Sequence, residues 1–308
     1  MLRRKVRARY ALDGGPFDSR SSKLPFGMTF DPRSDPDVPP GMSLELLQEL
    51  HLLTRDGHLN ADARRKLKQI RHLVGLLRPA LDDALARHAE PALVDCGAGK
   101  SALGALLYEL VLGPAGRGAL YAVESRPDLV AGAATRAARH GQARFHFVTG
   151  LIADAELPEC LQVVTALHAC DTATDDALVL AIARGADHVA VVPCCQAEVA
   201  RQLAATSDRE PADEALIRHA LHRRELGSHL TNVVRGLCLA AHGYKVTVTE
   251  LVGWEHSAKN ELVLGARVHR FHAESRATLA RLLERWRVEP ALVRLLRTRG
   301  LDPCAPAS

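Results

Sequence analysis

Two glycines and two acidic residues form the first group whose types and spacing suit a chemical task. Residues 92–104 read Ala-Leu-Val-Asp-Cys-Gly-Ala-Gly-Lys-Ser-Ala-Leu-Gly, with an apolar stretch before the glycines and helical spacing after them. Gly97 and Gly99 predict a tight turn, because a Cβ there would disfavour a positive φ and hold a ligand away from the backbone. Glu124 ends the next apolar stretch, 25 residues after Gly99. An acidic side chain at that position accepts hydrogen bonds from ribose hydroxyls, so the pattern predicts a site for an adenosine-containing cofactor.

Three cofactors compete for this turn. NAD prefers Gly-x-Gly-x-x-Gly, and Ala102 stands where the third glycine is expected. ATP at a phosphate-binding loop requires Gly-x-x-x-x-Gly-Lys-Ser/Thr, whose end matches Gly99-Lys100-Ser101. Val94 occupies the position of its first glycine, inside the predicted strand, which removes most of the phosphate-binding backbone.

S-adenosylmethionine is the third candidate and the one that we adopt. Asp-x-Gly-x-Gly followed by an acidic strand end resembles motifs I and II of the class I methyltransferases. The expected cofactor-binding residues in this part of the chain are Asp95, Gly97, Gly99, Lys100 and Glu124.

Side chains suited to proton transfer follow a later apolar stretch. His168 comes directly after residues 162–167, and a neutral imidazole there can take a proton from an attacking hydroxyl or amine. Asp171 is the second candidate, and the alternative is that the two side chains bond to each other and only hold the loop. The three residues Arg218, His229 and Arg235 lie in a basic stretch that predicts either phosphate contacts or a solvated helix face.

Cys194 and Cys195 allow three interpretations. A Pro-Cys pair resembles the cytosine C5 methyltransferases, in which a thiolate attacks the ring. A metal site would need further ligands, and only His168 and Cys170 are obvious, so we expect no metal. We favour the third interpretation, that these small polarisable side chains pack beneath the cofactor.

Strands and helices that alternate along the chain must position these groups. Five strand–helix units begin at residue 92, and two further strands, 244–251 and 261–268, follow a helical stretch at 213–242. The alternation predicts an α/β fold with a mostly parallel sheet, in which right-handed crossovers place helices on both faces. The resemblance to class I methyltransferases adds a Rossmann-like, seven-stranded sheet whose last strand is antiparallel. Ligands of such sheets bind beyond the carboxyl ends of the strands, which adds Gly150, Ile152 and His168 to the expected cofactor site.

The segment after residue 251 supplies the last group of candidates. It follows a strand that, if parallel, ends on the same side as the others, and it lacks the Asn-Gly or Asp-Gly of a tight turn. We expect it to form the wall opposite the cofactor, with His256 and Lys259 orienting or deprotonating the acceptor. The alternative is a loop whose polar residues cap one another. The expected substrate-binding residues are Cys194, Gln196, Trp254, Glu255 and Asn260.

Three stretches sharpen the resemblance: residues 166–178 with Leu-His-Ala-Cys-Asp-Thr-Ala-Thr-Asp, residues 192–196 with Pro-Cys-Cys-Gln, and Glu-His-Ser-Ala-Lys-Asn at 255–260. They resemble a methyltransferase-domain family of bacterial proteins, eukaryotic methyltransferase-like proteins and a glutathione-transferase-like fusion protein. They are also similar to the acceptor-stem tRNA 2′-O-ribose methyltransferases, whose zinc-finger segments have no counterpart here. The Asn/Asp-Pro-Pro-Tyr signature of amino methyltransferases is absent after residue 167, which argues against exocyclic base amines as acceptors.

Composition limits the classes of protein that fit. The chain of 308 residues is 47% hydrophobic but only 4% aromatic, so we expect a large core of Ala, Leu and Val. No apolar run reaches the length of a membrane span, and the N-terminus lacks the apolar segment of a secretory signal. Seven cysteines without regular spacing favour a reducing cytoplasm over a disulfide framework.

The expected organisation has four parts: a mobile basic and proline-rich arm (1–41), an N-terminal helical region (42–90), the cofactor-binding domain (91–268) and a C-terminal helical tail (269–308). In the helical region, Pro79 is expected to kink or break the helix. The expected function is an S-adenosylmethionine-dependent methyltransferase that acts on RNA at oxygen or nitrogen. Small-molecule or protein methylation and a non-catalytic cofactor-binding scaffold are the alternatives, and the oligomeric state stays open.

Overall fold

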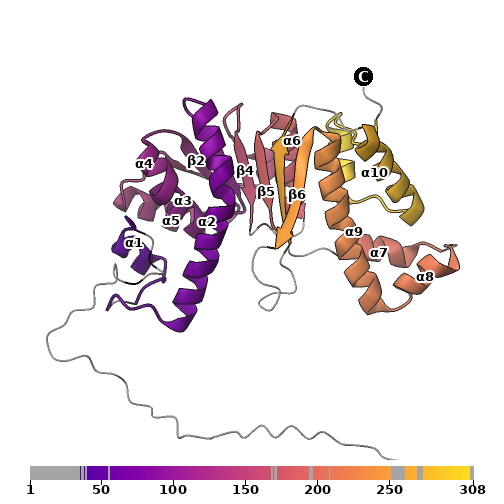
Figure 1. The fold of residues 1–308 in the computed structure, drawn as a ribbon, viewed down its shortest axis with the longest axis horizontal. Helices are drawn as coiled ribbons and strands as arrows, with labels where there is room; N and C mark the ends of the chain where they lie inside the picture. Colours follow the sequence, from indigo (N-terminus) through magenta and orange to yellow (C-terminus); the bar gives the residue numbers. More distant parts are fainter. Residues whose placement is uncertain are drawn as a thin grey trace, which may run out of the picture.

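Seven strands form one mixed sheet at the centre of the molecule (Figure 1). The computed structural model describes residues 35, 38, 40–54, 56–167, 169, 172–193, 197–207, 209–250, 261–268 and 273–305. The strands follow the order β3-β2-β1-β4-β5-β7-β6, with only β7 antiparallel to its neighbours. Their bounds are β1 Ala92–Cys96, β2 Ala119–Glu124, β3 Phe145–Thr149, β4 Val163–Ala166, β5 His188–Val191, β6 Tyr244–Glu250 and β7 Glu261–Arg267. This is the predicted Rossmann-like methyltransferase sheet, and the expected fold class is confirmed.

Helices cover both faces of the sheet because the central strands are apolar on both faces. Every residue of β1 and β4 is buried, and alternate residues enter different cores: Leu93 and Val163 pack on one face, Val94 and Val164 on the other. On the first face lie α2 (Ala61–Arg87), α3 (Ala102–Leu107) and α5 (Pro127–Arg139). On the second lie α6 (Thr172–Arg184), α9 (Ala220–Ala241), α10 (Ala273–Trp286) and α11 (Ala291–Thr298). The short elements are α1 (Leu44–Glu49), a π-helical turn (Tyr108–Leu112), α4 (Gly113–Ala115), a 3₁₀ turn (Ile152–Asp154), α7 (Glu198–Ala205) and α8 (Pro211–Ile217).

Several expected element boundaries were wrong. The helix α2 runs unbroken through Pro79, although proline removes one hydrogen-bond donor, because its face of leucines stays packed on the sheet. The helical stretch expected after the glycines divides into α3 and a π-helical turn, and Ser101 precedes it with a left-handed φ of 52°. The helical stretch expected at 213–242 divides into α8 and α9, and α7 precedes it.

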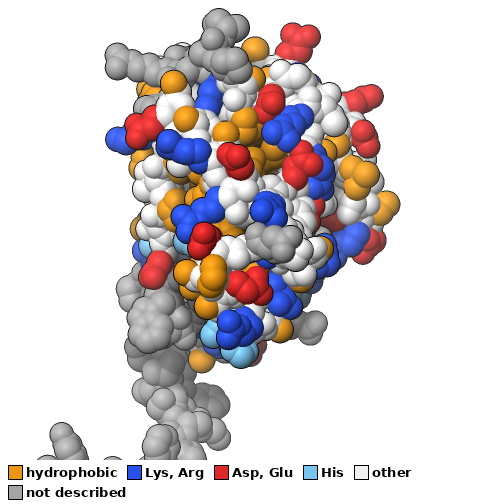
Figure 2. Space-filling model, turned by 90° about the vertical axis from the view of Figure 1, so that its right-hand side faces the viewer, with side chains coloured by type: hydrophobic (Ala, Val, Ile, Leu, Met, Phe, Trp, Pro, Cys, Tyr) orange, Lys and Arg blue, Asp and Glu red, His pale blue; other side chains and the backbone are white. Residues whose placement is uncertain are grey.

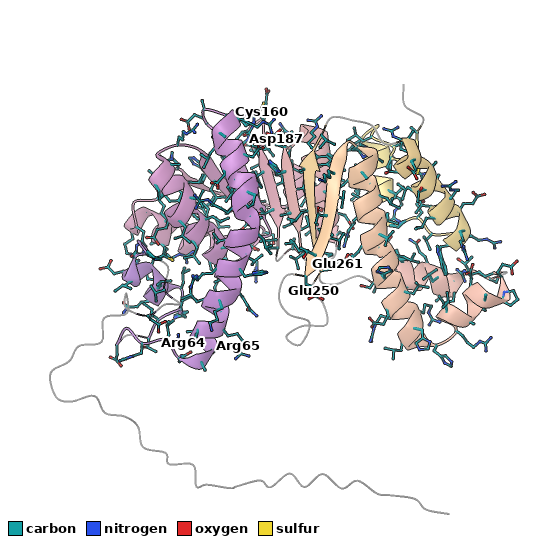
Figure 3. All side chains as sticks on the ribbon, viewed as in Figure 1. Arg64, Arg65, Cys160, Asp187, Glu250 and Glu261 are labelled. Atoms are coloured by element: carbon teal, nitrogen blue, oxygen red, sulfur yellow. The ribbon has the colours of Figure 1, made fainter. Side chains whose placement is uncertain are left out.

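Two long helices extend past the edge where the parallel strands end. Both α2 and α9 lead directly into the start of a parallel strand, so their first residues point toward the carboxyl ends of the strands. With 27 and 22 residues they are longer than the strands of four to seven residues. At ~1.5 Å per residue their N-terminal halves therefore project beyond the sheet. Figure 3 shows this edge at its lower side, where Glu250 ends β6, Glu261 begins β7, and Arg64 and Arg65 lie near the start of α2.

No described helix is long and apolar enough to cross a membrane.

Candidate functional site

The glycine turn after β1 has the backbone geometry that the sequence predicted. Gly97 and Gly99 have φ values of 67° and 57°, in the left-handed region. The N–H groups of Gly97 and Ala98 both donate to the carbonyl of Val123, at 2.9 and 3.0 Å, which fastens the turn to the end of β2. A Cβ on Gly97 would lie 3.1 Å from the Cβ of Ala169, whereas within the described part of the chain one on Gly99 would approach only the Arg126 guanidinium, at 4.0 Å. The missing Cβ of Gly97 therefore allows close packing against Ala169, and the missing Cβ of Gly99 leaves the backbone accessible on one face of the turn.

Glu124 is held against this turn by a full set of hydrogen bonds. Its Oε2 accepts the N–H of Gly99 at 2.8 Å, and its Oε1 accepts the N–H and Nε of Arg126 at 3.1 and 3.0 Å. Burial raises the pKa of Glu124, but the donors from Arg126 and Gly99 outweigh burial and leave the pKa below its ordinary value. The side chain is an ionised acceptor beside the glycine turn, which is the property that a ribose-binding carboxylate requires.

Asp95 lies deeper than the other predicted cofactor residues. It is fully buried in β1, and its Oδ1 accepts the hydroxyl of Thr165 in β4 at 2.9 Å. Desolvation raises its pKa to about 6, although the hydrogen bond from Thr165 opposes this. Asp95 therefore changes protonation close to neutral pH, and sequence reasoning missed its partner because Thr165 reads as an ordinary strand residue.

The remaining described candidates border the turn. Lys100 is exposed, and its carbonyl accepts Nη2 of Arg136 at 2.5 Å, which ties the turn to α5. Ile152 is 7% exposed and packs in the main core, whereas its neighbour Leu151 is 63% exposed. Leu151 therefore offers the accessible apolar surface after β3.

All of the expected catalytic and substrate-binding residues lie outside the described part of the chain: His168, Asp171, Cys194, Gln196, Trp254, Glu255, His256, Lys259 and Asn260. Cys170 and Cys195 lie outside it too. The described residues next to them end β4, β5 and β6 or begin β7, at the same edge of the sheet as the glycine turn. Among the described residues, no group of three or more His, Cys, Asp or Glu side chains is arranged to hold a metal ion.

A buried ion pair lies beside these segments and corrects one expectation. Arg235, expected in a basic stretch, is instead buried, and its Nε donates to Oδ1 of Asp175 at 2.7 Å. It lies on the face of α9 that packs on α6, whereas Arg218 is exposed at the end of α8. At the start of α6, the hydroxyl of Thr174 donates to the carbonyl of Ala169 at 2.8 Å.

A second polar contact joins α9 to the sheet at the same edge. Nδ2 of Asn232 donates to Oε2 of Glu261, the first residue of β7, at 2.7 Å. Figure 3 shows Glu261 at the lower end of the sheet. Together with the Arg235–Asp175 pair, this contact fixes α9 against β7 and α6 next to the expected acceptor side. Neither pair has a local signal in the sequence.

The projecting ends of α2 and α9 are both basic. In α2, exposed side chains of the first half include Arg65, Lys66, Lys68, Arg71 and His72. Around the start of α9 the exposed ones are Arg218, His219, His222 and Arg224, with Arg223 partly buried. The first turn of α9 contains no acidic residue, and the exposed Glu225 that follows pairs with Arg224 at 3.1 Å, which leaves the end basic overall. Two positively charged helix ends therefore stand on either side of the strand ends.

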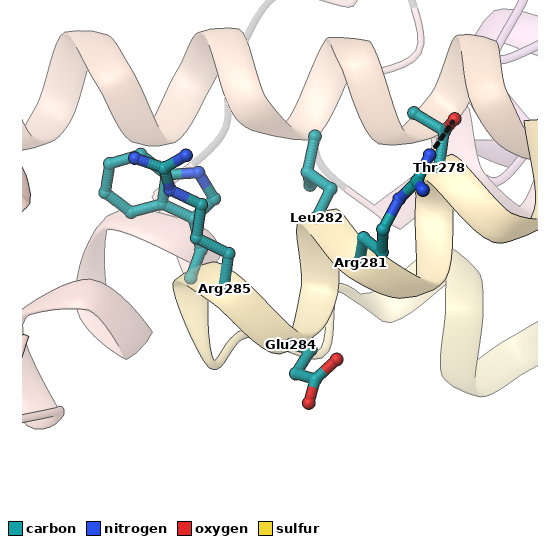
Figure 4. A pocket seen from close by; sticks show the side chains of 6 residues that line it. Thr278, Arg281, Leu282, Glu284 and Arg285 are labelled. Atoms are coloured by element: carbon teal, nitrogen blue, oxygen red, sulfur yellow. Dashed lines mark hydrogen bonds between the residues drawn. The ribbon is translucent and has the colours of Figure 1, made fainter.

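The face beyond α10 is different in character. Figure 2 shows Lys and Arg side chains interspersed there with Asp and Glu, and His gathered with basic side chains at its lower end. A pocket of about 670 Å³ on α10 is lined by Thr278, Arg281, Leu282, Glu284, Arg285 and Trp286 (Figure 4). Arg285 is already paired with Asp213, at 2.9 Å. This pocket lies away from the glycine turn and takes no part in the candidate site.

Comparison with known proteins identifies the class. Residues 65–202 match a family model described as a methyltransferase domain, which covers just under half of the chain. The chain therefore contains a class I methyltransferase domain, and it is an enzyme that uses S-adenosylmethionine. Curated proteins yielded no match.

Solved structures with the same kind of fold are distant. An rRNA methylase from Streptococcus thermophilus is 13% identical, with a TM-score of 0.40, over 63% of this chain and 95% of that one. Magnesium protoporphyrin IX methyltransferase from Synechocystis PCC 6803, with bound SAH, is 14% identical, with a TM-score of 0.40, over 72% of this chain and 94% of that one. A Methanococcus jannaschii fibrillarin pre-rRNA processing protein is 12% identical, with a TM-score of 0.35, over 59% and 68%. Similarity at this level does not bear on what this chain methylates.

Proposed function

We propose that this enzyme methylates RNA, at an oxygen or a nitrogen atom. The observation that carries the proposal is the pair of basic helix ends, on α2 and α9, that project on either side of the strand ends. A nucleic-acid backbone is bound chiefly through Lys and Arg contacts to phosphates, and such contacts fix the position of the strand without reading its sequence. An RNA that spans both ends would bring its acceptor nucleotide to the edge where the glycine turn lies.

The residues of the turn fit the cofactor. The open face of Gly99 admits the adenosyl group to the backbone, and the carboxylate of Glu124 accepts the ribose hydroxyls. Asp95, buried in β1, supports the turn through its hydrogen bond to Thr165. Gly150, Leu151 and Ile152 line the part of the site that would hold the adenine. When bound, S-adenosylmethionine supplies an electrophilic methyl group on its sulfonium sulfur.

The acceptor must lose a proton as it is methylated. We assign proton transfer to His168, with Asp171 as its partner, and acceptor orientation to His256 and Lys259. We assign substrate contacts to the five side chains Cys194, Gln196, Trp254, Glu255 and Asn260. With seven cysteines in the chain, a reducing cytoplasm is the proposed compartment.

Transfer of tritium from labelled S-adenosylmethionine into separate RNA, protein and metabolite fractions tests the substrate class. Label in RNA supports the proposal, and label only in protein or metabolites contradicts it. Arg218→Ala with Arg224→Ala should weaken RNA binding and leave cofactor affinity unchanged. Arg78→Ala is the matched control, because Arg78 is equally exposed but lies on the far half of α2, paired with Asp82.

His256→Ala and Lys259→Ala test the proposed acceptor side. Each should keep cofactor affinity and melting temperature but lose methyl transfer. Normal turnover in both variants would exclude these two residues from the chemistry.

A further inference from the structure

Arg126 donates hydrogen bonds to the Glu124 carboxylate, the group that is proposed to accept hydrogen bonds from the cofactor ribose. Five donors point at the two oxygens of Glu124, and three of them come from Arg126: its N–H, its Nε at 3.0 Å and its Nη2 at 3.5 Å. The others are the N–H of Gly99 and the hydroxyl of Ser125. A carboxylate has about four lone-pair directions for acceptance, so this one has none left for a diol.

The Arg126 side chain also reaches toward the face of the turn on which Gly99 has no Cβ. Among the described residues, its Nη2 is the one atom that comes within 4 Å of the position where a Cβ on Gly99 would stand, at 4.0 Å. The guanidinium therefore reaches from the ribose-binding carboxylate across the backbone that the adenosyl group must approach. Two separate geometric facts, at Glu124 and at Gly99, place the same side chain on the cofactor's path.

The Arg126 side chain can move into solvent at a lower cost in free energy than the Glu124 carboxylate can lose its hydrogen-bond donors. The side chain of Arg126 is 63% exposed and pairs with the oxygens of Glu124, whose own side chain is 8% exposed. Release into water costs a guanidinium little, because it stays hydrated, whereas the buried carboxylate needs replacement donors. The two hydroxyls of a ribose are such donors.

We infer that Arg126 is a latch on the cofactor site, which pairs with Glu124 in the free enzyme and is displaced by the ribose hydroxyls when the cofactor binds. The inference rests on the proposed role of Glu124 and adds a residue that sets cofactor affinity by competition. The latch keeps a buried carboxylate satisfied between turnovers and lowers affinity for the cofactor and for the demethylated product alike.

Calorimetry with S-adenosylhomocysteine tests the latch. Arg126→Ala removes the competitor, so affinity should rise about two- to fivefold, the range expected for an exposed ion pair. Salt screens the competing pair, so wild-type affinity should rise between about 0.05 and 0.5 M salt, and that of Arg126→Ala should stay constant.

Arg139→Ala is the matched control. Arg139 lies at the other end of α5, is 61% exposed and pairs with Glu49 at 2.5 Å, so its loss should leave affinity and its salt dependence unchanged. Weaker binding by Arg126→Ala would contradict the inference, because Arg126 would then contribute to cofactor binding. Equal binding would contradict it too, because Arg126 would then have no effect on cofactor affinity. Absence of binding by the wild type would instead overturn the cofactor site itself, which separates the two failures.

Discussion

Alanine at Gly97 and at Gly99 should have opposite consequences for stability and for binding. Both residues have positive φ, so either alanine costs about 1–2 kcal/mol in strain, partly offset by about 0.4–1 kcal/mol of lost unfolded-state entropy. Only Gly97 faces a neighbour: its Cβ would lie 3.1 Å from the Cβ and 3.2 Å from the Cα of Ala169. Carbon atoms pack best at about 3.5–4.0 Å, so the segment after β4 must shift, at a cost of about 1–3 kcal/mol.

The backbone strain and the unfolded-state entropy are the same for both alanines, so they cancel when the stabilities of the two variants are compared. Gly97→Ala should therefore be about 1–3 kcal/mol less stable than Gly99→Ala in urea unfolding, with the same m-value. Gly99→Ala should instead lose affinity for S-adenosylhomocysteine, because its Cβ stands on the open face of the turn. Equal stabilities, or full cofactor affinity in Gly99→Ala, would refute the assignment of packing to Gly97 and of ligand approach to Gly99.

Three further predictions concern charge. Burial raises the pKa of Asp95 from 3.8 to about 6, so ionising it opposes folding as pH rises through that window. The free energy of unfolding of Asp95→Asn relative to wild type should therefore increase by up to roughly 3 kcal/mol between about pH 4 and pH 7. Urea titrations of both proteins at the two pH values measure this difference. Arg235→Met leaves Asp175 buried without its partner and should cost roughly 3–5 kcal/mol in the same assay, and a loss below 1 kcal/mol would show that the pair is not buried in solution. Arg218→Ala with Arg224→Ala should lower the slope of log RNA affinity against log salt by about 1.4, and an unchanged slope would remove both from the RNA contact.

Much of the fold could be predicted because its signals are local. The two glycines, the apolar strands on either side and the acidic residue that ends β2 lie within residues 92–124, and each obeys a rule of backbone conformation or burial. The parallel sheet followed from the alternation of strand and helix, and its antiparallel last strand from the family resemblance. The structure confirmed the antiparallel β7 and the parallel β6.

The errors arose where distant residues decide the outcome. Arg235 reads as part of a basic stretch, and only the packing of α9 on α6 places it opposite Asp175. Pro79 reads as a helix breaker, yet the leucines on either side of it bury enough surface on the sheet to keep α2 continuous. Arg126 stands two residues after Glu124, but its competition for the carboxylate depends on side-chain direction, which spacing does not reveal.

The central claim is that the turn at Gly97 and Gly99, with Glu124, holds S-adenosylmethionine. Calorimetric titration of S-adenosylhomocysteine into wild type and Glu124→Gln, with thermal unfolding to confirm that both are folded, tests it most directly. The amide keeps the shape of Glu124 but loses its charge and half of its acceptor capacity, so we expect saturable one-to-one binding in wild type and a loss of more than tenfold in the variant. Equal affinity in the two proteins, or binding of NADH or ATP in place of S-adenosylhomocysteine, would contradict the claim.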